Sequence, residues 1–180
     1  MITQKIIITG GPGTGKTSII TRLKEDGYFC FEEISRQITL DARKEGTEQL
    51  FLTDPILFSE RLLEGRIKQY DEASKSPQNF VFLDRGIPDV LAYLKYSGTD
   101  YPIKFEQACN DYRYDKIFVL APWQEIFESD NERYEDFDQA EQIHQYLLHT
   151  YEDFNYKLWD VPFGSVEKRT QFILNAINKG

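Results

Sequence analysis

Residues 10–17 read GGPGTGKT and combine several glycines with a lysine and a threonine. This run fits the pattern G-x-x-x-x-G-K-[ST], which binds nucleotide phosphates when it lies between a buried strand and a helix. Glycines let a phosphate approach the main chain and allow positive φ angles. We therefore predict that the phosphate loop and the first residues after it bind a nucleotide: Gly11, Pro12, Gly13, Thr14, Gly15, Lys16, Thr17 and Ser18.

Lys16 and Thr17 are the two residues of this loop whose side chains are expected to take part in chemistry. Unpaired N–H groups and the positive end of the helix dipole favour an anion at the start of a helix. The Lys16 ammonium group should then reach the β and γ phosphates, and the Thr17 hydroxyl should ligate Mg²⁺.

Further charged residues follow two other apolar runs, residues 28–31 and 80–83. Ligands of open α/β sheets lie outside the carboxyl ends of the strands, so these side chains should face the site. Glu33 and Arg36 are expected three residues apart on one helical face, where they contact a substrate. The alternative is a solvated helix start, at which acidic residues offset the dipole.

Asp84, Arg85 and Asp89 lie in the segment DRGIPD that follows the second of these runs. Asp84 is expected to hold Mg²⁺ or its water, and either Asp84 or Glu33 could accept the proton of a hydroxyl group. Arg85 should orient an anionic group; its alternative is an ion pair with Asp89 one turn on. The predicted substrate side is Glu33, Arg36, Arg85 and Asp89.

Residues 123–137 are predicted to form a lid, because residues 128–136 read ESDNERYED and contain almost nothing apolar. Arg133 could close over the transferring phosphoryl group as a fixed positive charge and take part in catalysis. The alternative for Arg133 is a surface ion pair with Glu128 or Glu135.

The elements that position these residues alternate along the chain. Apolar runs at residues 5–9, 28–31, 80–83, 116–120 and 158–162 predict strands, and helical patterns begin near residues 16, 55, 88, 102, 137 and 166. Asp54 before Pro55 and Ser165 before the last pattern are cap signals. Residues 38–53 have only a weak pattern. We predict an α/β fold, a doubly wound, mostly parallel five-stranded sheet of the P-loop NTPase type with a lid segment, in a single domain over residues 1–180.

Composition and charge narrow the class of protein. A chain of 180 residues with 41% hydrophobic residues is expected to form one domain. A net charge of −9 opposes binding to nucleic acid or to an anionic membrane. The first predicted strand begins too close to Met1 for a signal peptide, and no apolar run is long enough to span a membrane, so we expect a cytoplasmic protein.

Cysteines and histidines give no metal pattern. Cys30 and Cys109 form no C-x-x-C pair and are expected to be reduced, buried thiols. His144 and His149 are five residues apart on one helix, whereas a metal pair needs three or four, so both are expected to be solvated.

Taken together, these motifs resemble those of the small P-loop kinases, and within them the AAA-domain family that includes the nicotinamide riboside kinase-like proteins. The resemblance spans nearly the whole chain and depends on residues 10–17, 84–89, 161–162 and 165–169, on Glu33 with Arg36, and on Asp130 with Arg133. It implies ATP and Mg²⁺ as cofactors and an adenine contact at residues 162–166. Relatives are expected to carry glycine where this chain has Asn155.

From the resemblance and the charged site we expect a kinase that transfers the ATP γ-phosphoryl group to a hydroxyl group of a nucleoside-like small molecule. The aromatic residues Phe31, Tyr93 and Tyr96 could stack on the ring of such an acceptor. The alternative is an ATP-hydrolysing, nucleotide-dependent switch that signals through its lid. A Ras-type GTPase does not fit, since the sequence has no D-x-x-G or N-K-x-D motif.

Overall fold

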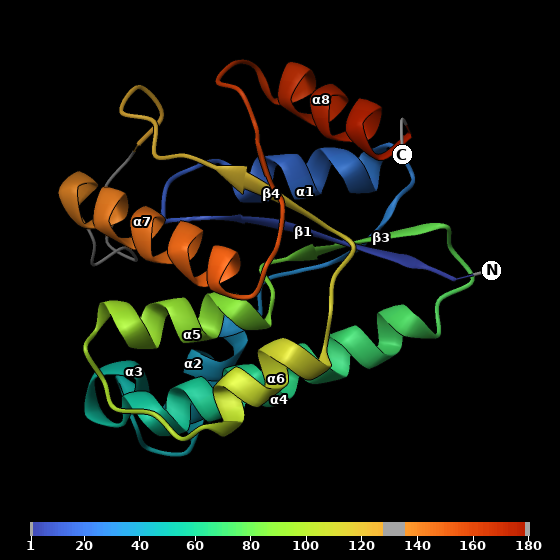
Figure 1. Cartoon of the computed structure of the whole chain (residues 1–180). Coiled ribbons are helices and arrows are strands. Elements are labelled where there is room, and N and C mark those ends of the chain that lie inside the picture. The colour runs from blue at the N-terminus through green and yellow to red at the C-terminus, as the bar shows by residue number, and fades with distance from the viewer. Residues whose placement is uncertain (1, 128–135, 179–180) are drawn as a thin grey trace.

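A five-stranded sheet forms the centre of the structure, a computed structural model that describes residues 2–127 and 136–178. All four pairings between neighbouring strands are parallel, in the order β2-β3-β1-β4-β5 (Figure 1). This arrangement confirms the predicted α/β fold. The strands are β1 (Gln4–Gly10), β2 (Phe29–Phe31), β3 (Phe80–Asp84), β4 (Lys116–Leu120) and β5 (Leu158–Asp160).

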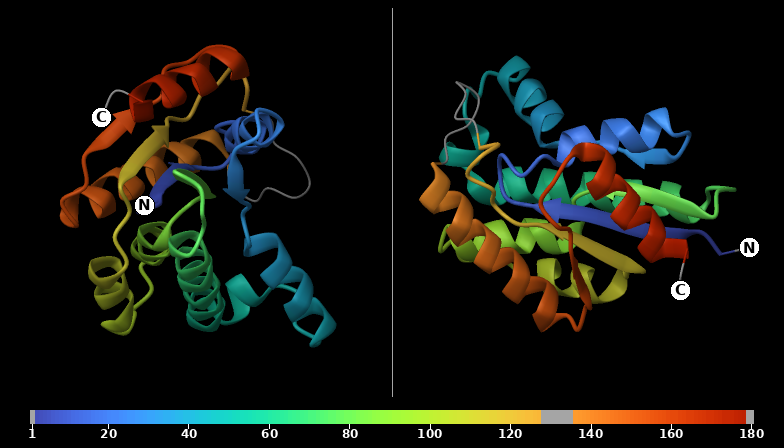
Figure 2. Two further views of the ribbon diagram at one scale, coloured as in Figure 1. Left: turned by 90° about the vertical axis from the view of Figure 1, so that its right-hand side faces the viewer. Right: turned by 90° about the horizontal axis from the view of Figure 1, so that it is seen from above.

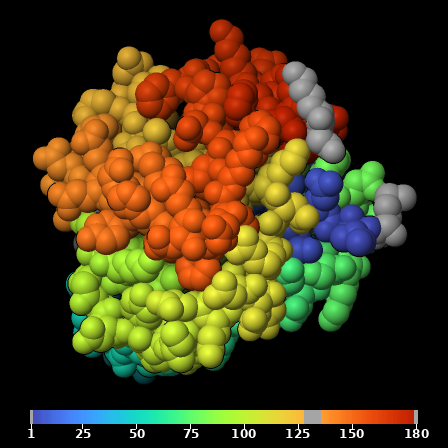
Figure 3. All heavy atoms as spheres, in the orientation of Figure 1, coloured from blue at the N-terminus to red at the C-terminus, as the bar shows by residue number. Residues whose placement is uncertain are grey.

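Helices cover both faces of the sheet (Figures 1 and 2). On one face lie α1 (Lys16–Glu25) and α8 (Val166–Asn178), which contact each other. The other face carries α4 (Pro55–Ser74), α5 (Ile87–Tyr96), α6 (Lys104–Asp111) and α7 (Phe137–Asp153). In the space-filling view the side chains of α5, α6 and α7 leave little of the central strand at the surface (Figure 3).

Strand β1 belongs to both hydrophobic cores, because successive residues of a strand point to opposite faces. Ile7 packs among residues of α4, α5 and α7. Ile6 and Ile8 pack on the other side, among residues of α1 and α8. All three side chains are fully buried, as expected for a parallel strand with helices on both sides.

Both predicted helix caps are present. The Asp54 carboxylate accepts a hydrogen bond from the Leu57 N–H at 2.9 Å at the start of α4. The Ser165 hydroxyl accepts one from the Lys168 N–H at 3.3 Å at the start of α8. These bonds fix where the two helices begin.

Residues 38–53, whose sequence pattern is weak, contain most of α2 (Ser35–Lys44) and all of α3 (Leu50–Thr53). Ala42 is the buried residue of α2, and Leu50 that of α3. Most residues of α2 are polar or charged and α3 is four residues long, so neither helix gives a long apolar stripe in the sequence.

The prediction that both histidines are solvated is wrong for His144, which is buried on the inner face of α7, whereas His149 is exposed.

Cys109 is a buried free thiol, and Cys30 is a partly buried one. Among the described residues, no helix is both long enough and apolar enough to pass through a membrane.

Candidate active site

The phosphate loop connects β1 to α1, so the strand and the helix that the motif requires are both present. Gly13 and Gly15 have φ angles of 70° and 86°, in the left-handed region that favours glycine. A Cβ on Gly10 would lie 2.5 Å from the Leu120 carbonyl oxygen of β4. The glycines are therefore needed for the turn itself and for its close packing on the neighbouring strand.

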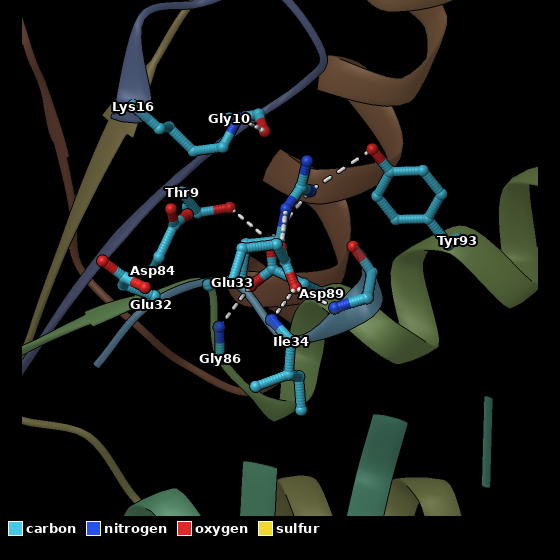
Figure 4. Close-up of polar contacts among 12 residues, drawn as sticks. Thr9, Gly10, Lys16, Glu32, Glu33, Ile34, Asp84, Gly86, Asp89 and Tyr93 are labelled. Atoms are coloured by element: carbon cyan, nitrogen blue, oxygen red, sulfur yellow. Dashed lines mark hydrogen bonds and ion pairs between the residues drawn. The ribbon is translucent and has the colours of Figure 1, made fainter. Parts of the chain in front are cut away.

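Lys16 lies buried along the inside of this loop (Figure 4). Its Nζ donates hydrogen bonds to the carbonyl oxygens of Gly10 at 2.8 Å and Gly11 at 2.7 Å. Burial, and after it the nearby Arg85 guanidinium, lower the pKa of Lys16 from 10.5 to about 7. An anion beside the loop would favour the charged form of this lysine. Thr17 and Ser18 are exposed at the start of α1.

A cavity of about 610 Å³ opens beside the loop. Trp123 and Ile126, which follow β4, form its opposite wall together with residues of α8 and the segment before it. The Trp123 ring stacks on the Phe163 ring with 5.0 Å between centroids. The cavity is lined by Gly13, Thr14, Gly15, Lys16, Thr17, Ser18, Trp123, Ile126, Gly164, Ser165, Val166 and Arg169. It thus includes three residues of the segment that the resemblance assigns to adenine.

The prediction that Glu33 and Arg36 share a helical face is wrong, because Glu33 precedes the first residue of α2. The Glu33 carboxylate instead turns back and accepts hydrogen bonds from the N–H groups of Ile34 at 2.8 Å and Ser35 at 3.1 Å (Figure 4). Arg36 lies in the first turn of α2 and is exposed. The start of α2 therefore holds Glu33 in place and directs it toward the site.

Two arginines pair with Glu33. Its Oε1 lies 2.9 Å from Nη2 of Arg66, and its Oε2 lies 2.6 Å from Nε of Arg85. Burial works to raise the pKa of Glu33, but the charges of Arg66 and Arg85 outweigh it and bring the pKa to about 2. A carboxylate with this pKa holds guanidinium groups well and accepts protons poorly.

Asp84 at the end of β3 differs from Glu33 in its partners and in the direction of its pKa shift. The residue is 5% exposed, and its Oδ1 has no hydrogen-bond partner among the described residues. Burial raises the pKa of Asp84, although the charge of Lys16 acts against this. Among the described residues, Asp84 therefore offers the site an oxygen without a partner, on a carboxyl group that takes up a proton more readily than that of Glu33.

Arg85 has a φ angle of 72°, which is unfavourable for a residue with a side chain and is often found at functional sites. Its Nη1 donates to the Tyr93 hydroxyl at 3.2 Å and lies 3.7 Å from Oδ1 of Asp89. The guanidinium carbon is also 5.3 Å from the centre of the Tyr93 ring. The predicted alternative, a pair with Asp89, is thus present in addition to the pair with Glu33.

Asp89 lies beneath the site, with an exposed fraction of 1%. Its carboxylate accepts hydrogen bonds from the Thr9 hydroxyl at 2.5 Å, the Gly86 N–H at 2.8 Å and the Tyr151 hydroxyl at 2.5 Å. This burial argues against the predicted contact between Asp89 and a substrate. The carboxylate instead joins β1, the loop after β3 and α7.

Four of the predicted functional residues are thus brought together at the carboxyl ends of β1, β2 and β3: Lys16, Glu33, Asp84 and Arg85. Arg133 and residues 128–135 of the predicted lid lie outside the described residues. Of the three aromatics expected near an acceptor, Tyr93 contacts Arg85, Phe31 packs against the core, and Tyr96 pairs with Tyr146.

The model of a protein family described as AAA domain matches residues 5–169. Deoxyadenosine kinase from M. mycoides, with products dCMP and a flexible dCDP bound, has a TM-score of 0.74 and 18% identity, over 98% of this chain and 100% of that one. NadR protein in complex with NR has a TM-score of 0.72 and 20% identity, over 99% of this chain and 49% of that one. Thymidylate kinase from Ehrlichia chaffeensis has a TM-score of 0.66 and 13% identity, over 98% of this chain and 100% of that one. No curated protein matches the sequence.

These comparisons confirm the resemblance predicted from the motifs and show a fold shared with nucleoside and nucleotide kinases.

Proposed function

The chain belongs to the AAA-domain family, and on that premise we propose that it is a kinase that transfers the γ-phosphoryl group of ATP to a hydroxyl group of a nucleoside-like molecule. The proposal is supported above all by the two-sided arrangement of the site. A phosphate loop and its cavity lie on one side, and Glu33 with its two arginine partners, Arg66 and Arg85, lies on the other. A kinase needs such an arrangement, since donor and acceptor must meet in line.

On the donor side, the loop amides and Lys16 bind and orient the phosphates of ATP. Thr17 is exposed beside the loop, and one Asp84 oxygen has no partner in the described part of the chain. Both residues therefore fit Mg²⁺, which prefers oxygen ligands and retains waters. When bound, the ion would shield the charge of the transferring phosphoryl group. Thr17 and Asp84 would hold the ion.

On the acceptor side, charge balance favours a neutral alcohol. The charges of Arg66 and Arg85 are matched by Glu33 and Asp89, both within ion-pair distance of a guanidinium group. A phosphate acceptor would add negative charge to a site whose nearest arginines are already paired. A hydroxyl acceptor needs only hydrogen bonds, which the Glu33 carboxylate and the Arg85 guanidinium can supply.

Asp84 is our candidate for the proton acceptor, because its Oδ1 has no hydrogen-bond partner among the described residues, whereas both carboxylate oxygens of Glu33 pair with arginines. The acceptor oxygen forms a bond to the γ-phosphorus as the bond to the β-phosphate oxygen breaks. The hydroxyl proton passes to Asp84, and ADP leaves. Glu33 orients Arg85 and the hydroxyl group throughout.

The test is transfer of label from γ-labelled ATP with Mg²⁺ to a panel of nucleosides and nucleoside monophosphates. We expect a labelled nucleoside monophosphate and no labelled diphosphate. Lys16→Met should abolish transfer, while Lys24→Met, an exposed position on the same helix, should not. Release of labelled inorganic phosphate without a labelled acceptor would contradict the proposal and favour the ATP-hydrolysing switch.

A further inference from the structure

Arg169 is a buried cation that lines the cavity beside the phosphate loop. It belongs to α8, which lies beside α1 in Figure 1, and its exposed fraction is 2%. Its Nη2 donates a hydrogen bond to the Thr14 carbonyl oxygen at 2.9 Å. The last helix of the chain thereby contacts the loop that follows the first strand.

The charge of Arg169 is not balanced by a carboxylate among the described residues, whereas Arg66 and Arg85 each pair with one. Its Nε is also buried without a hydrogen-bond partner there. Removing a charge from water is costly unless an opposite charge compensates it. An unpaired guanidinium in the wall of a cavity therefore points to an anionic ligand in that cavity.

The contact with Thr14 also determines the direction of the next amide group. A trans peptide is planar, so the N–H of Gly15 points opposite to the Thr14 carbonyl and away from Arg169. A Cβ on Gly15 would lie 2.7 Å from Nη1 of Arg169. Glycine at this position thus provides both the positive φ angle and the space that the guanidinium occupies.

We propose that Arg169 is a positioning residue of the donor site, an inference that depends on the donor half of the proposed function and not on the acceptor. Arg169 orients the Gly15 N–H toward the polyphosphate, and its charge favours anionic ligands. Its guanidinium carbon lies 5.9 Å from the centre of the Trp123 ring, which lines the same cavity. One side chain therefore links the phosphate loop to the aromatic wall of the cavity.

The experiment measures binding of AMP, ADP and ATP with Mg²⁺ to the full chain by calorimetry. Loop amides of this motif bind the α and β phosphates, so the loss should be greater for ligands that have a β-phosphate. Arg169→Met should weaken the binding of ADP and ATP about tenfold or more, as expected for the loss of a charge-assisted contact. It should weaken the binding of AMP less than about threefold. Lys168→Met, the same kind of change at an exposed neighbour, should leave all three affinities unchanged.

Arg169→Lys retains the charge but loses the planar guanidinium group, so it should give an intermediate loss of affinity for ADP and ATP. This variant replaces Arg169→Met in the experiment if the methionine variant does not fold. Equal losses for AMP, ADP and ATP, or unchanged affinities in a folded variant, would overturn the inference. Nucleotide binding that depends on Arg169 without phosphoryl transfer would support the inference and contradict the proposed function. A wild-type chain that binds none of the nucleotides would overturn both.

Discussion

Glu33 is a single carboxylate held between two guanidinium groups, and this placement has a measurable pH dependence. Its pKa is about 2 in the folded chain against an ordinary value of 4.5. A lowered pKa contributes stability that is complete above pH 4.5 and is lost as the pH falls toward 2. Between pH 7 and pH 3 this loss amounts to about 2 kcal/mol in the free energy of unfolding.

Glu33→Gln removes the titrating group, so the difference in unfolding free energy between wild type and variant should shrink by about 2 kcal/mol from pH 7 to pH 3. Urea unfolding at both pH values measures this difference. Glu32→Gln is the matched control, because Glu32 is exposed and its partner Lys24 lies at the surface. A difference that is independent of pH would show that Glu33 is not held as a charged group.

At the scale of the residue, the sequence could predict the phosphate loop because all its functional groups lie within eight successive positions. The sequence gives no site role to Arg66, or to Arg169 beyond its place in the resemblance, for the opposite reason. They reach their partners Glu33 and Thr14 across 33 and 155 residues. No spacing within a helix distinguishes such an arginine from one on a solvated face. Only the tertiary packing makes them part of the site.

At the scale of the element, the buried hydrogen bonds of Asp89 connect three parts of the fold. Tyr151→Phe removes the donor from α7 and leaves one carboxylate oxygen with fewer partners. We expect a loss of about 1–3 kcal/mol in the free energy of unfolding. Tyr146→Phe, an exposed position on the same helix, should change it by less than about 0.5 kcal/mol. Urea unfolding of both variants tests this, and equal effects would argue against the role of the network.

The end of α7 gives a second prediction for an element. Asn155 has a φ angle of 59°, and the backbone N–H groups of Asn155 and Tyr156 donate to the carbonyl oxygens of Glu152 and Tyr151. These bonds form a Schellman motif, whose left-handed residue is usually glycine. The geometry therefore explains why glycine was expected in relatives at this position.

Asn155→Ala should lower the free energy of unfolding by about 1 kcal/mol, because an L-residue with a Cβ is strained in this region. Asn155→Gly should change it by less than about 0.5 kcal/mol, since glycine adopts the angle without strain. Thermal unfolding of the two variants side by side gives the comparison. A glycine variant as unstable as the alanine variant would exclude the conformational explanation.

Strands β1, β3 and β4 and the long helices could be predicted because each buries a regular pattern of apolar residues. The start of α2 could not, since Ala42 is its buried residue and the position of Glu33 depends on hydrogen bonds to Ile34 and Ser35. His144 was assigned to solvent from its spacing to His149, but the face of α7 that contains Ile143 and Leu147 also buries His144. Packing between elements decided both cases.

At the scale of the whole molecule, the donor site joins the two ends of the chain across the centre of the sheet. The loop continues from β1, the central strand, whose residues pack in both cores. Arg169 connects α8 to this loop through its hydrogen bond to the Thr14 carbonyl oxygen. A ligand that binds in this cavity contacts residues of the phosphate loop and of α8 at once, so we expect binding to stabilise the chain as a unit.

ATP with Mg²⁺ at about one hundred times its dissociation constant should therefore add about 2.7 kcal/mol to the free energy of unfolding. For a chain of 180 residues this corresponds to a rise in melting temperature of roughly 5–10 °C. Scanning calorimetry at several ATP concentrations measures the rise, and a single transition should shift without splitting. Lys16→Met should remove the shift because it deletes the ammonium group of the loop, whereas Lys24→Met should retain it. If ATP shifted only part of the thermal unfolding transition to higher temperature, the donor site would not connect the two ends of the chain.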